Sequence, residues 1–299
     1  MSSGDTLHTV VVIGGSAGSL EPLATIVELL PASLKACVLV VVHRGAGSVG
    51  MLPRILSKRA SLPVTFAEDF DRIKPGHIYV ARADRHLIVT AESVRVVHGP
   101  RENGFRPAID PLFRTAGREM GPRAIGVILS GALSDGAYGL SVIKRQGGVA
   151  IVQDPAEAAI DRMPTSAMAV MDVDFVLPST EIASAIVRLT REREGQGVPV
   201  MARPKDLEPQ LPSEQTSVSQ MEQRYGAPSP FTCPDCGGTL WEIEEGRVVR
   251  MRHDHDPISA RAPCERRHQR AAVLLRGRDD GRARRQAQTC DQRVEGVGR

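Results

Sequence analysis

The chain has 299 residues, a formal net charge of +3 and an aromatic content of only 3%. This length allows one large domain with a smaller one beside it, and the nearly balanced charge gives no indication of a nucleic-acid partner. Five cysteines at irregular spacing do not form a disulfide framework, and no apolar run is long enough to span a membrane. Because the first residues also lack a secretory signal, we expect a soluble, cytoplasmic protein without membrane insertion.

Short runs rich in valine and isoleucine alternate with amphipathic stretches from residue 7 to residue 190. The runs predict strands at HTVVVIG, CVLVVVH, HIYVA, AIGVILSG, GVAIVQD and DFVLP. Helices are predicted over 19–30, 49–59, 109–120, 135–146 and 180–191, and LIVTAESVRVVHG predicts an inserted hairpin. Strands that are apolar on both faces and separated by helices indicate a three-layer α/β/α fold, doubly wound, with a mostly parallel sheet.

The composition changes near residue 191. Residues 1–192 are predicted to form the α/β domain, and residues 193–228 a polar, proline-rich linker. Residues 229–250 are compact and strand-like, and resemble part of a zinc ribbon. Residues 251–299 are rich in arginine and lack apolar periodicity, so they are predicted to be a disordered tail.

A glycine turn follows the first predicted strand. Its sequence, GGSAG from Gly14 to Gly18, matches the pattern G-x-S-x-G, which exposes a serine between a strand and a helix. The turn could present Ser16 as a nucleophile, could bind a phosphate at the helix N-terminus, or could be purely structural. It lacks the spacing of a dinucleotide-binding fingerprint and the lysine of a P-loop. The turn alone leaves these alternatives open.

A nucleophilic serine needs a base and a carboxylate that orients the base. His43 ends the second predicted strand, and Asp135 follows AIGVILSG and begins the next helical stretch. Because the active groups of doubly wound folds gather at the carboxyl ends of strands, Ser16, His43 and Asp135 are the predicted triad. If Asp135 instead caps its own helix, Asp110 or Asp154 is the alternative carboxylate. The less well placed histidines begin a strand or lie near the hairpin: His8, His77, His86 and His98.

These motifs resemble the catalytic domain of the CheB-type chemotaxis protein-glutamate methylesterases. The resemblance spans about residues 8–190 and rests on VVVIGGSAGSLEPL, VVVHRGAG, RENGFRPAIDPLFRTAG, ILSGALSDGAYGL and VAIVQDPAEAAIDRMPTSA. It implies hydrolysis of methyl esters on glutamate side chains of methyl-accepting chemoreceptor helices, with release of methanol, and often deamidation of glutamine. The family's triad matches Ser16, His43 and Asp135, and a cognate methyltransferase is a further expected partner.

The sequence departs from the family's pattern at two positions beside the predicted triad. Ala17 stands where a threonine usually follows the nucleophile, and Ala132 stands where a methionine commonly follows the glycine. Both changes affect the oxyanion pocket, for which Gly15, Ala17, Gly131 and Ala132 are the predicted residues. Arg106 is the candidate for contact with acidic receptor helices, and a solvated loop arginine is the alternative.

Three further expectations concern regulation, metal binding and the alternatives to hydrolysis. The best-known family members carry a receiver domain before this one, and none is expected here because the first strand begins by residue 8. No cofactor is expected to be required for catalysis. Cys233 and Cys236 in CPDCGG could hold zinc with His253, His255 or Cys264, or they could be an incomplete half-site that binds no metal stably, since no second C-x-x-C follows. A phosphate- or nucleotide-binding module and a receptor-binding regulatory module without turnover remain the alternative functions.

Overall fold

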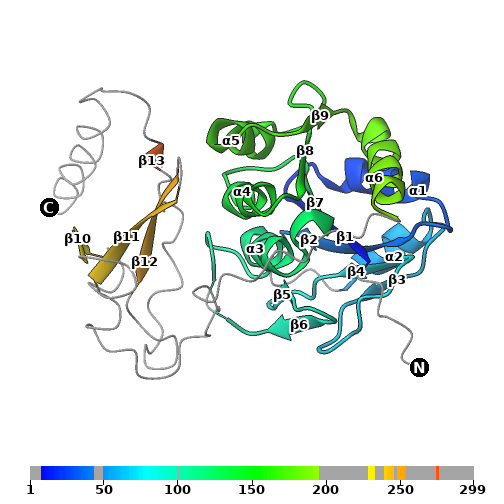
Figure 1. Cartoon of the computed structure of the whole chain (residues 1–299), viewed down its shortest axis with the longest axis horizontal. Coiled ribbons are helices and arrows are strands. Elements are labelled where there is room, and N and C mark those ends of the chain that lie inside the picture. Colours follow the sequence, from blue (N-terminus) through cyan, green and yellow to red (C-terminus); the bar gives the residue numbers. More distant parts are fainter. Residues whose placement is uncertain are drawn as a thin grey trace, which may run out of the picture.

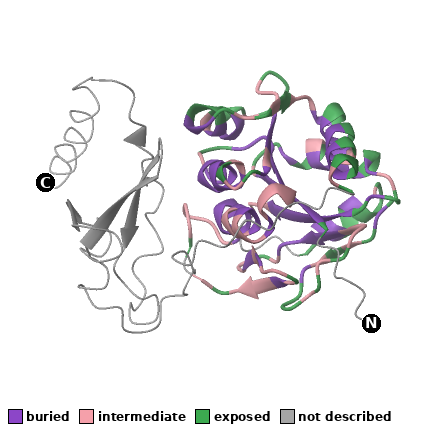
Figure 2. Ribbon diagram, in the orientation of Figure 1, coloured by how far each residue is buried: buried purple, intermediate pink, exposed green. Residues whose placement is uncertain are grey.

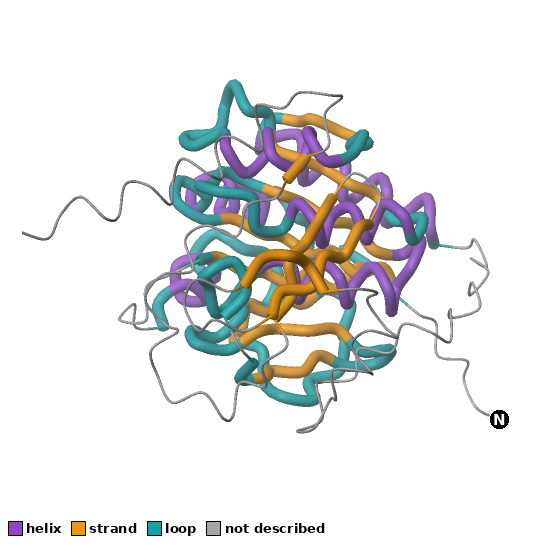
Figure 3. The backbone as a smooth tube through the Cα atoms, turned by 90° about the vertical axis from the view of Figure 1, so that its left-hand side faces the viewer, coloured by secondary structure: helices purple, strands orange, loops and turns teal. Residues whose placement is uncertain are grey.

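The computed structural model describes residues 8–43, 50–99, 101–194, 228–232, 239–245, 248–253 and 274–275. Its larger sheet contains β1 (Thr9–Gly15), β2 (Ala36–Val42), β3 (Val64–Phe66), β4 (His77–Val80), β7 (Ala124–Ile128), β8 (Val149–Gln153) and β9 (Phe175–Leu177). These seven strands are all parallel and lie in the order β3-β4-β2-β1-β7-β8-β9. Figure 3 turns the view by 90° and shows the strands following one another through the molecule.

Two layers of helices enclose this sheet (Figure 1). The helices are α1 (Leu20–Leu29), α2 (Leu52–Ser57), α3 (Ile109–Met120), α4 (Ala137–Arg145), α5 (Arg162–Val170) and α6 (Ser179–Arg193). One face of the sheet packs against α3, α4 and α5, and the other packs against α1, α2 and α6. The three-layer α/β/α prediction is confirmed, and the sheet is fully rather than mostly parallel.

The core lies on both faces of the central strands, as the apolar runs require. In β1, Val10 and Val12 join the cluster formed with α3–α5, while Val11 and Ile13 join the cluster on the other face. All four side chains are at most 1% exposed. The buried residues accordingly form continuous bands along the strands, with exposed residues on the outer sides of the helices (Figure 2). A strand buried on both faces cannot alternate with polar residues, which explains its unbroken apolar sequence.

The predicted hairpin is present as β5 (His86–Val89) and β6 (Val94–Val97), paired antiparallel. It packs on α3, where the backbone N–H of Val89 donates to Thr115 Oγ1 at 2.9 Å. His86 is buried, and its Nδ1 accepts from the backbone N–H of Ala108 at 3.2 Å. His86 therefore has a structural position beneath the segment that leads into α3.

The strand order reverses at β1, which lies between β2 and β7. The chain leaves β1, builds one half of the sheet, and returns to the other side of β1 at β7. The loops after β1, β2 and β7 therefore meet at the carboxyl edge, where α/β proteins place their sites. In the β1–β2 pairing, Gly15 lies opposite Val42, so Ser16 and His43 follow as neighbours.

The elements of the α/β unit that the sequence did not predict are α5, the three-residue edge strand β3 and a short 3-10 helix at Gly121–Arg123. Outside this unit, β10 (Pro228–Thr232), β11 (Thr239–Glu245), β12 (Val248–His253) and β13 (Leu274–Leu275) form an antiparallel sheet. These strands overlap residues 229–250, and β12 and β13 reach into residues 251–299; the proposed domain boundaries stay a prediction. Cys233 and Cys236 lie outside the described residues, so zinc binding remains a prediction.

Candidate active site

Ser16 begins the tight turn that joins β1 to α1. Its carbonyl accepts from the Ser19 backbone N–H at 3.1 Å and from Ser19 Oγ at 2.6 Å. Gly18 has φ +79°, a conformation open to glycine, and a Cβ there would lie 2.7 Å from Ser130 Oγ. Ser16 itself is half-exposed, while Gly15 before it and Ser19 after it are buried. The turn therefore presents one hydroxyl at the carboxyl edge of the sheet.

His43 and Asp135 form a buried pair beside this turn. His43 Nε2 donates to Asp135 Oδ2 at 2.7 Å, and the two side chains are 3% and 0% exposed. The backbone N–H of His43 donates to the Gly15 carbonyl at 3.0 Å, which ties the end of β2 to the strand that carries Ser16. The structure thus brings together the predicted base and the predicted orienting carboxylate.

Asp135 accepts from four donors in all. Besides His43 Nε2, Oδ2 accepts from the Ile109 N–H at 2.7 Å, and Oδ1 accepts from Asn103 Nδ2 at 2.7 Å and from the Asp110 N–H at 3.2 Å. Two of these donors are the first N–H groups of α3, where the helix dipole favours a negative charge. The Asp135 carboxylate therefore accepts two hydrogen bonds on each of its oxygens, an arrangement that fixes its orientation.

The two alternative carboxylates have other partners. Asp110 Oδ1 accepts from the backbone N–H groups of Gly136 and Gly139 at 3.2 and 2.7 Å, which places it at the start of α4. Asp154 Oδ1 accepts from the Ala156 N–H at 2.9 Å in a surface turn. Since His43 Nε2 contacts Asp135, the geometry selects Asp135 from the three candidates.

The second ring nitrogen of His43 is the one left for Ser16. Because Nε2 faces a carboxylate, it carries the hydrogen, and Nδ1 keeps the lone pair that can accept a proton. Nδ1 is buried and has no hydrogen-bond partner among the described residues. The expected Ser16–His43 hydrogen bond is therefore not formed, although the two residues are neighbours across the strand ends. Such contacts are often looser without substrate.

Ser130, two residues after the end of β7, connects the parts of the site. Its carbonyl accepts from the Ser16 N–H at 3.0 Å, and its Oγ donates to the Ala17 carbonyl at 3.0 Å. Its own N–H donates to the Gln153 side chain at 2.9 Å. Ser130 thus connects the turn that carries Ser16 to the ends of β7 and β8 through hydrogen bonds. No motif in the sequence indicated this role.

The predicted oxyanion residues divide into two groups. The Gly131 N–H is already used, because it donates to the Ile160 carbonyl at 3.0 Å, and Gly15 is buried within β1. Ala17 and Ala132 are exposed beside Ser16, and their N–H groups donate to no backbone carbonyl of the described residues. Free N–H groups at such a place suit a developing oxyanion, so Ala17 and Ala132 are the better placed candidates.

At Gly131 a glycine is needed because a side chain would collide with Ser16 and Met163. A Cβ there would lie 2.8 Å from Ser16 Cβ and 2.7 Å from Met163 Cε. We expect Gly131→Ala to lower the turnover number by about 10- to 100-fold, because a small displacement of the nucleophile is enough. At Gly50 an added Cβ has 3.5 Å to its nearest neighbour, so Gly50→Ala serves as the matched control in the same kinetic assay. A folded Gly131→Ala protein with normal turnover would contradict this expectation.

Arg106 is largely enclosed by its own domain. Its Nε and NH2 groups contact Asp84 Oδ1 at 2.8 and 2.7 Å, its NH1 donates to the Gly99 carbonyl at 2.8 Å, and its side chain is 10% exposed. The predicted alternative of a solvated loop arginine does not describe this residue. The internal partners favour a structural role over contact with a receptor helix.

We expect Arg106→Ala to lower the free energy of unfolding by about 1–3 kcal/mol, because its partners lose a charged donor. The Michaelis constant for substrate should stay within about threefold of the wild-type value, since a structural arginine does not contact the substrate. Arg95→Ala is the control, because the Arg95 side chain that pairs with Asp69 is 35% exposed and the pair is expected to contribute below about 1 kcal/mol. Denaturant unfolding and kinetics, measured on the same samples, distinguish a structural role of Arg106 from a role in substrate binding. A large rise in the Michaelis constant, with an unchanged free energy of unfolding, would instead support a direct contact between Arg106 and the substrate.

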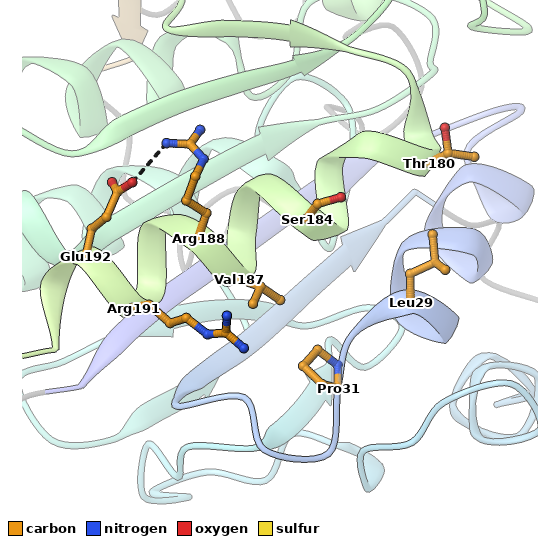
Figure 4. A pocket seen from close by; sticks show the side chains of 8 residues that line it. All are labelled: Leu29, Pro31, Thr180, Ser184, Val187, Arg188, Arg191 and Glu192. Carbon is orange, nitrogen blue, oxygen red and sulfur yellow. Dashed lines mark hydrogen bonds and ion pairs between the residues drawn. The ribbon is translucent and has the colours of Figure 1, made fainter.

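Two other features of the described residues lie apart from this site. Burial raises the pKa of the Cys37 thiol to about 12, so this cysteine stays protonated and does not act as a nucleophile. A groove of about 560 Å³ lies where α1 ends beside α6, lined by Leu29, Pro31, Thr180, Ser184, Val187, Arg188, Arg191 and Glu192 (Figure 4). None of the predicted site residues lines it. No cluster of three metal-ligating side chains occurs among the described residues.

Fold and site together are those of a hydrolase with a serine nucleophile on an α/β scaffold. The profile of the CheB methylesterase family matches residues 11–186, and the chain belongs to that family. No helix in the described segments has the length and apolar character needed to cross a bilayer.

Three similar proteins illustrate the match. The crystal structure of the Thermotoga maritima CheB methylesterase catalytic domain is 32% identical, with a TM-score of 0.59, over 61% of this chain and 98% of that one. The protein-glutamate methylesterase/protein-glutamine glutaminase of Moorella thermoacetica is 41% identical over 60% of this chain and 44% of its own length. A Leptospira interrogans relative, provisionally given the same two activities, is 42% identical over 61% of this chain and 95% of its own. The similarity thus covers the α/β unit.

Proposed function

We propose that this protein hydrolyses the methyl esters of glutamate side chains on methyl-accepting chemoreceptors and releases methanol. The observation that carries this proposal is the buried His43–Asp135 pair, 2.7 Å apart, at the strand switch point beside Ser16. Family membership supports the same reaction. We include a cytoplasmic location and a cognate methyltransferase in this proposal, because the substrate would be a methylated receptor segment.

The chemistry follows from the partners of each group. Ser16 Oγ attacks the ester carbonyl and passes its proton to His43 Nδ1, the ring nitrogen without a partner in the described part of the chain. Asp135 keeps the hydrogen on Nε2 and stabilises the imidazolium that forms. The N–H groups of Ala17 and Ala132 hold the oxyanion. The imidazolium then protonates the departing methoxide, and a water activated by the neutral imidazole releases the acyl group.

The same groups can also act on glutamine. Attack on a side-chain amide forms the same acyl-enzyme, with ammonia leaving in place of methanol. The Moorella relative carries protein-glutamine glutaminase in its name, which favours this second activity. Neither reaction needs a metal or an organic cofactor, because the base, the nucleophile and the oxyanion donors all come from the chain.

The proposal is tested by methanol release from a methylated receptor preparation, together with labelling of the protein by a fluorophosphonate probe. A serine hydrolase of this type releases methanol and is labelled at Ser16. A phosphate- or nucleotide-binding module, or a receptor-binding scaffold, gives neither signal and instead retains its ligand without turnover. Labelling without methanol release would keep the hydrolase mechanism and reject the receptor ester as the substrate.

A further inference from the structure

The segment before α3 forms a four-residue hairpin turn that the reaction described above does not use. In this turn, Glu102–Phe105, the N–H of each end residue donates to the carbonyl of the other, at 3.1 and 2.9 Å. Asn103 and Gly104 both have positive φ, 53° and 82°, the pattern of a type I′ turn. Asparagine tolerates positive φ better than most residues, and glycine adopts it freely, so the sequence Asn103–Gly104 suits this turn. We call it the Asn103 turn.

The side chain of Asn103 connects two buried carboxylates. Its Nδ2 donates to Asp135 Oδ1 at 2.7 Å and to Asp110 Oδ2 at 3.0 Å. The two aspartates are only 1% and 3% exposed, so water does little to reduce their mutual repulsion. An amide nitrogen has two hydrogens, and this one directs them at two like charges. It therefore both orients Asp135 and offsets the charge of Asp110.

The next side chain of the turn contacts the base itself. The Phe105 ring stacks on the His43 imidazole with centroids 3.6 Å apart and an angle of 9° between the planes. A flat contact of this kind restricts rotation of the imidazole out of the plane that contains Asp135. One turn thus contacts both members of the His43–Asp135 pair.

The Asn103 turn is fixed to the helix that also holds Asp135. Arg114 of α3 makes two hydrogen bonds to the Glu102 carboxylate, at 2.6 and 3.0 Å. The Arg114 side chain is 18% exposed, so this pair is more than a solvated surface contact. The charge of Arg114 also acts on Asp110 of the same helix and on Tyr138 of α4. Glu102, Asp110, Arg114 and Tyr138 are thus charged or titratable groups that interact beside the Asn103 turn.

We infer that Asn103 is a positioning residue of this site, which holds the Asp135 carboxylate toward His43 and separates it from the charge of Asp110. This inference rests on the proposed hydrolytic function. Without the amide, the negative charge of the two aspartates is less offset. The His43–Asp135 pair then keeps a proton up to a higher pH, and a protonated pair cannot accept the proton of Ser16. Asn103 would thus set the lower pH limit of activity as well as the geometry.

Two substitutions test this role. Asn103→Gly keeps the positive φ of the turn and removes the amide, while Asn103→Asp keeps the shape and places a third carboxylate between the other two. We expect Asn103→Gly to lower the turnover number by about 10- to 100-fold with a nearly unchanged Michaelis constant. The acid limb of the pH–rate profile should move to higher pH in both variants, by about one unit or more in Asn103→Asp.

Phe70→Gly is the matched control, because Phe70 also has positive φ, at 67°, and its exposed ring lies over Arg95 rather than over the site. It should leave both the turnover number and the pH profile unchanged. Methanol release and the rate of fluorophosphonate labelling are measured from pH 5 to pH 9, with thermal unfolding of each variant. A wild-type protein that is neither labelled nor active rejects the proposed function. An active wild type whose Asn103 variants keep its pH profile, or lose activity only as they lose folding, rejects the inference.

Discussion

Replacement of Ser16 by alanine is expected to lower the turnover number by about 10⁶-fold, as removal of a triad serine does in a serine protease. This corresponds to about 8 kcal/mol of transition-state stabilisation. Among the described residues, the Ser16 hydroxyl is the group placed to form the acyl-enzyme, since Cys37 is buried within β2 and stays protonated. Methanol release and fluorophosphonate labelling should disappear together.

The same substitution should leave the fold intact. Ser16 is half-exposed, and its Oγ makes no hydrogen bond to a described residue, so the free energy of unfolding should change by less than about 0.5 kcal/mol. Ser57→Ala in α2 is the matched control, because that hydroxyl bonds only the carbonyl of Pro53 in its own helix. Normal turnover in Ser16→Ala would reject the serine mechanism, and a protein that unfolds would show that the turn needs the hydroxyl.

The fold was predictable because its central strands are buried on both faces. Each apolar run is a strand of the central sheet, and the polar residue after it lies at the carboxyl edge. Ser16, His43 and Asp135 could therefore be chosen by position alone, since three strand ends converge where the strand order reverses. The pairing of His43 with Asp135 rather than Asp110 or Asp154 depends on side-chain directions, and only the structure decides it.

The elements that escaped prediction carry weak local signals. The helix α5 has the sequence RMPTSAMAV, in which Pro164 and two hydroxyl residues lower the helix propensity. The proline is tolerated because it lies in the first turn. Met163 and Ala167 are buried against the sheet, so tertiary packing outweighs propensity. The strand β3 has three residues at the sheet edge, too few for a pattern to be recognised.

The supporting residues of the site could be found only in part from the sequence. The Asn103–Gly104 pair is a known signal for a type I′ turn, so the turn itself was open to prediction. Its contacts were not, because Asn103 meets Asp135 across 32 residues of chain and Phe105 meets His43 across the domain. Ser130 likewise acts through tertiary hydrogen bonds that leave no local pattern. Such contacts arise only once the sheet is assembled.

Replacement of Asp135 by asparagine is expected to lower the turnover number by about 10⁴-fold, close to the loss for the corresponding change in a serine protease. All four partners of the carboxylate are donors: His43 Nε2, Asn103 Nδ2 and the N–H groups of Ile109 and Asp110. An asparagine side chain has one oxygen and one NH2 group, so two of these donors must face another donor.

Each orientation of the new amide has its own cost. With NH2 toward His43, the ring must carry its hydrogen on Nδ1, the nitrogen that should accept the proton of Ser16. With NH2 toward Asn103, the Asn103 amide must reverse and turn its oxygen toward Asp110. Either arrangement also leaves a backbone N–H of α3 unsatisfied, which should lower the free energy of unfolding by about 1–3 kcal/mol.

Asp154→Asn is the matched control for this change. Its carboxylate accepts from Ala156 in a surface turn and does not contact His43, so turnover should stay within about threefold of wild type. Turnover numbers and thermal unfolding of the two variants, measured on the same methylated receptor, give the comparison. If Asp135→Asn folds and turns over normally, His43 does not depend on this carboxylate for its tautomer. If Asp110→Asn instead shows the larger loss, then Asp110, held at the start of α4 in the structure, is the carboxylate on which catalysis depends.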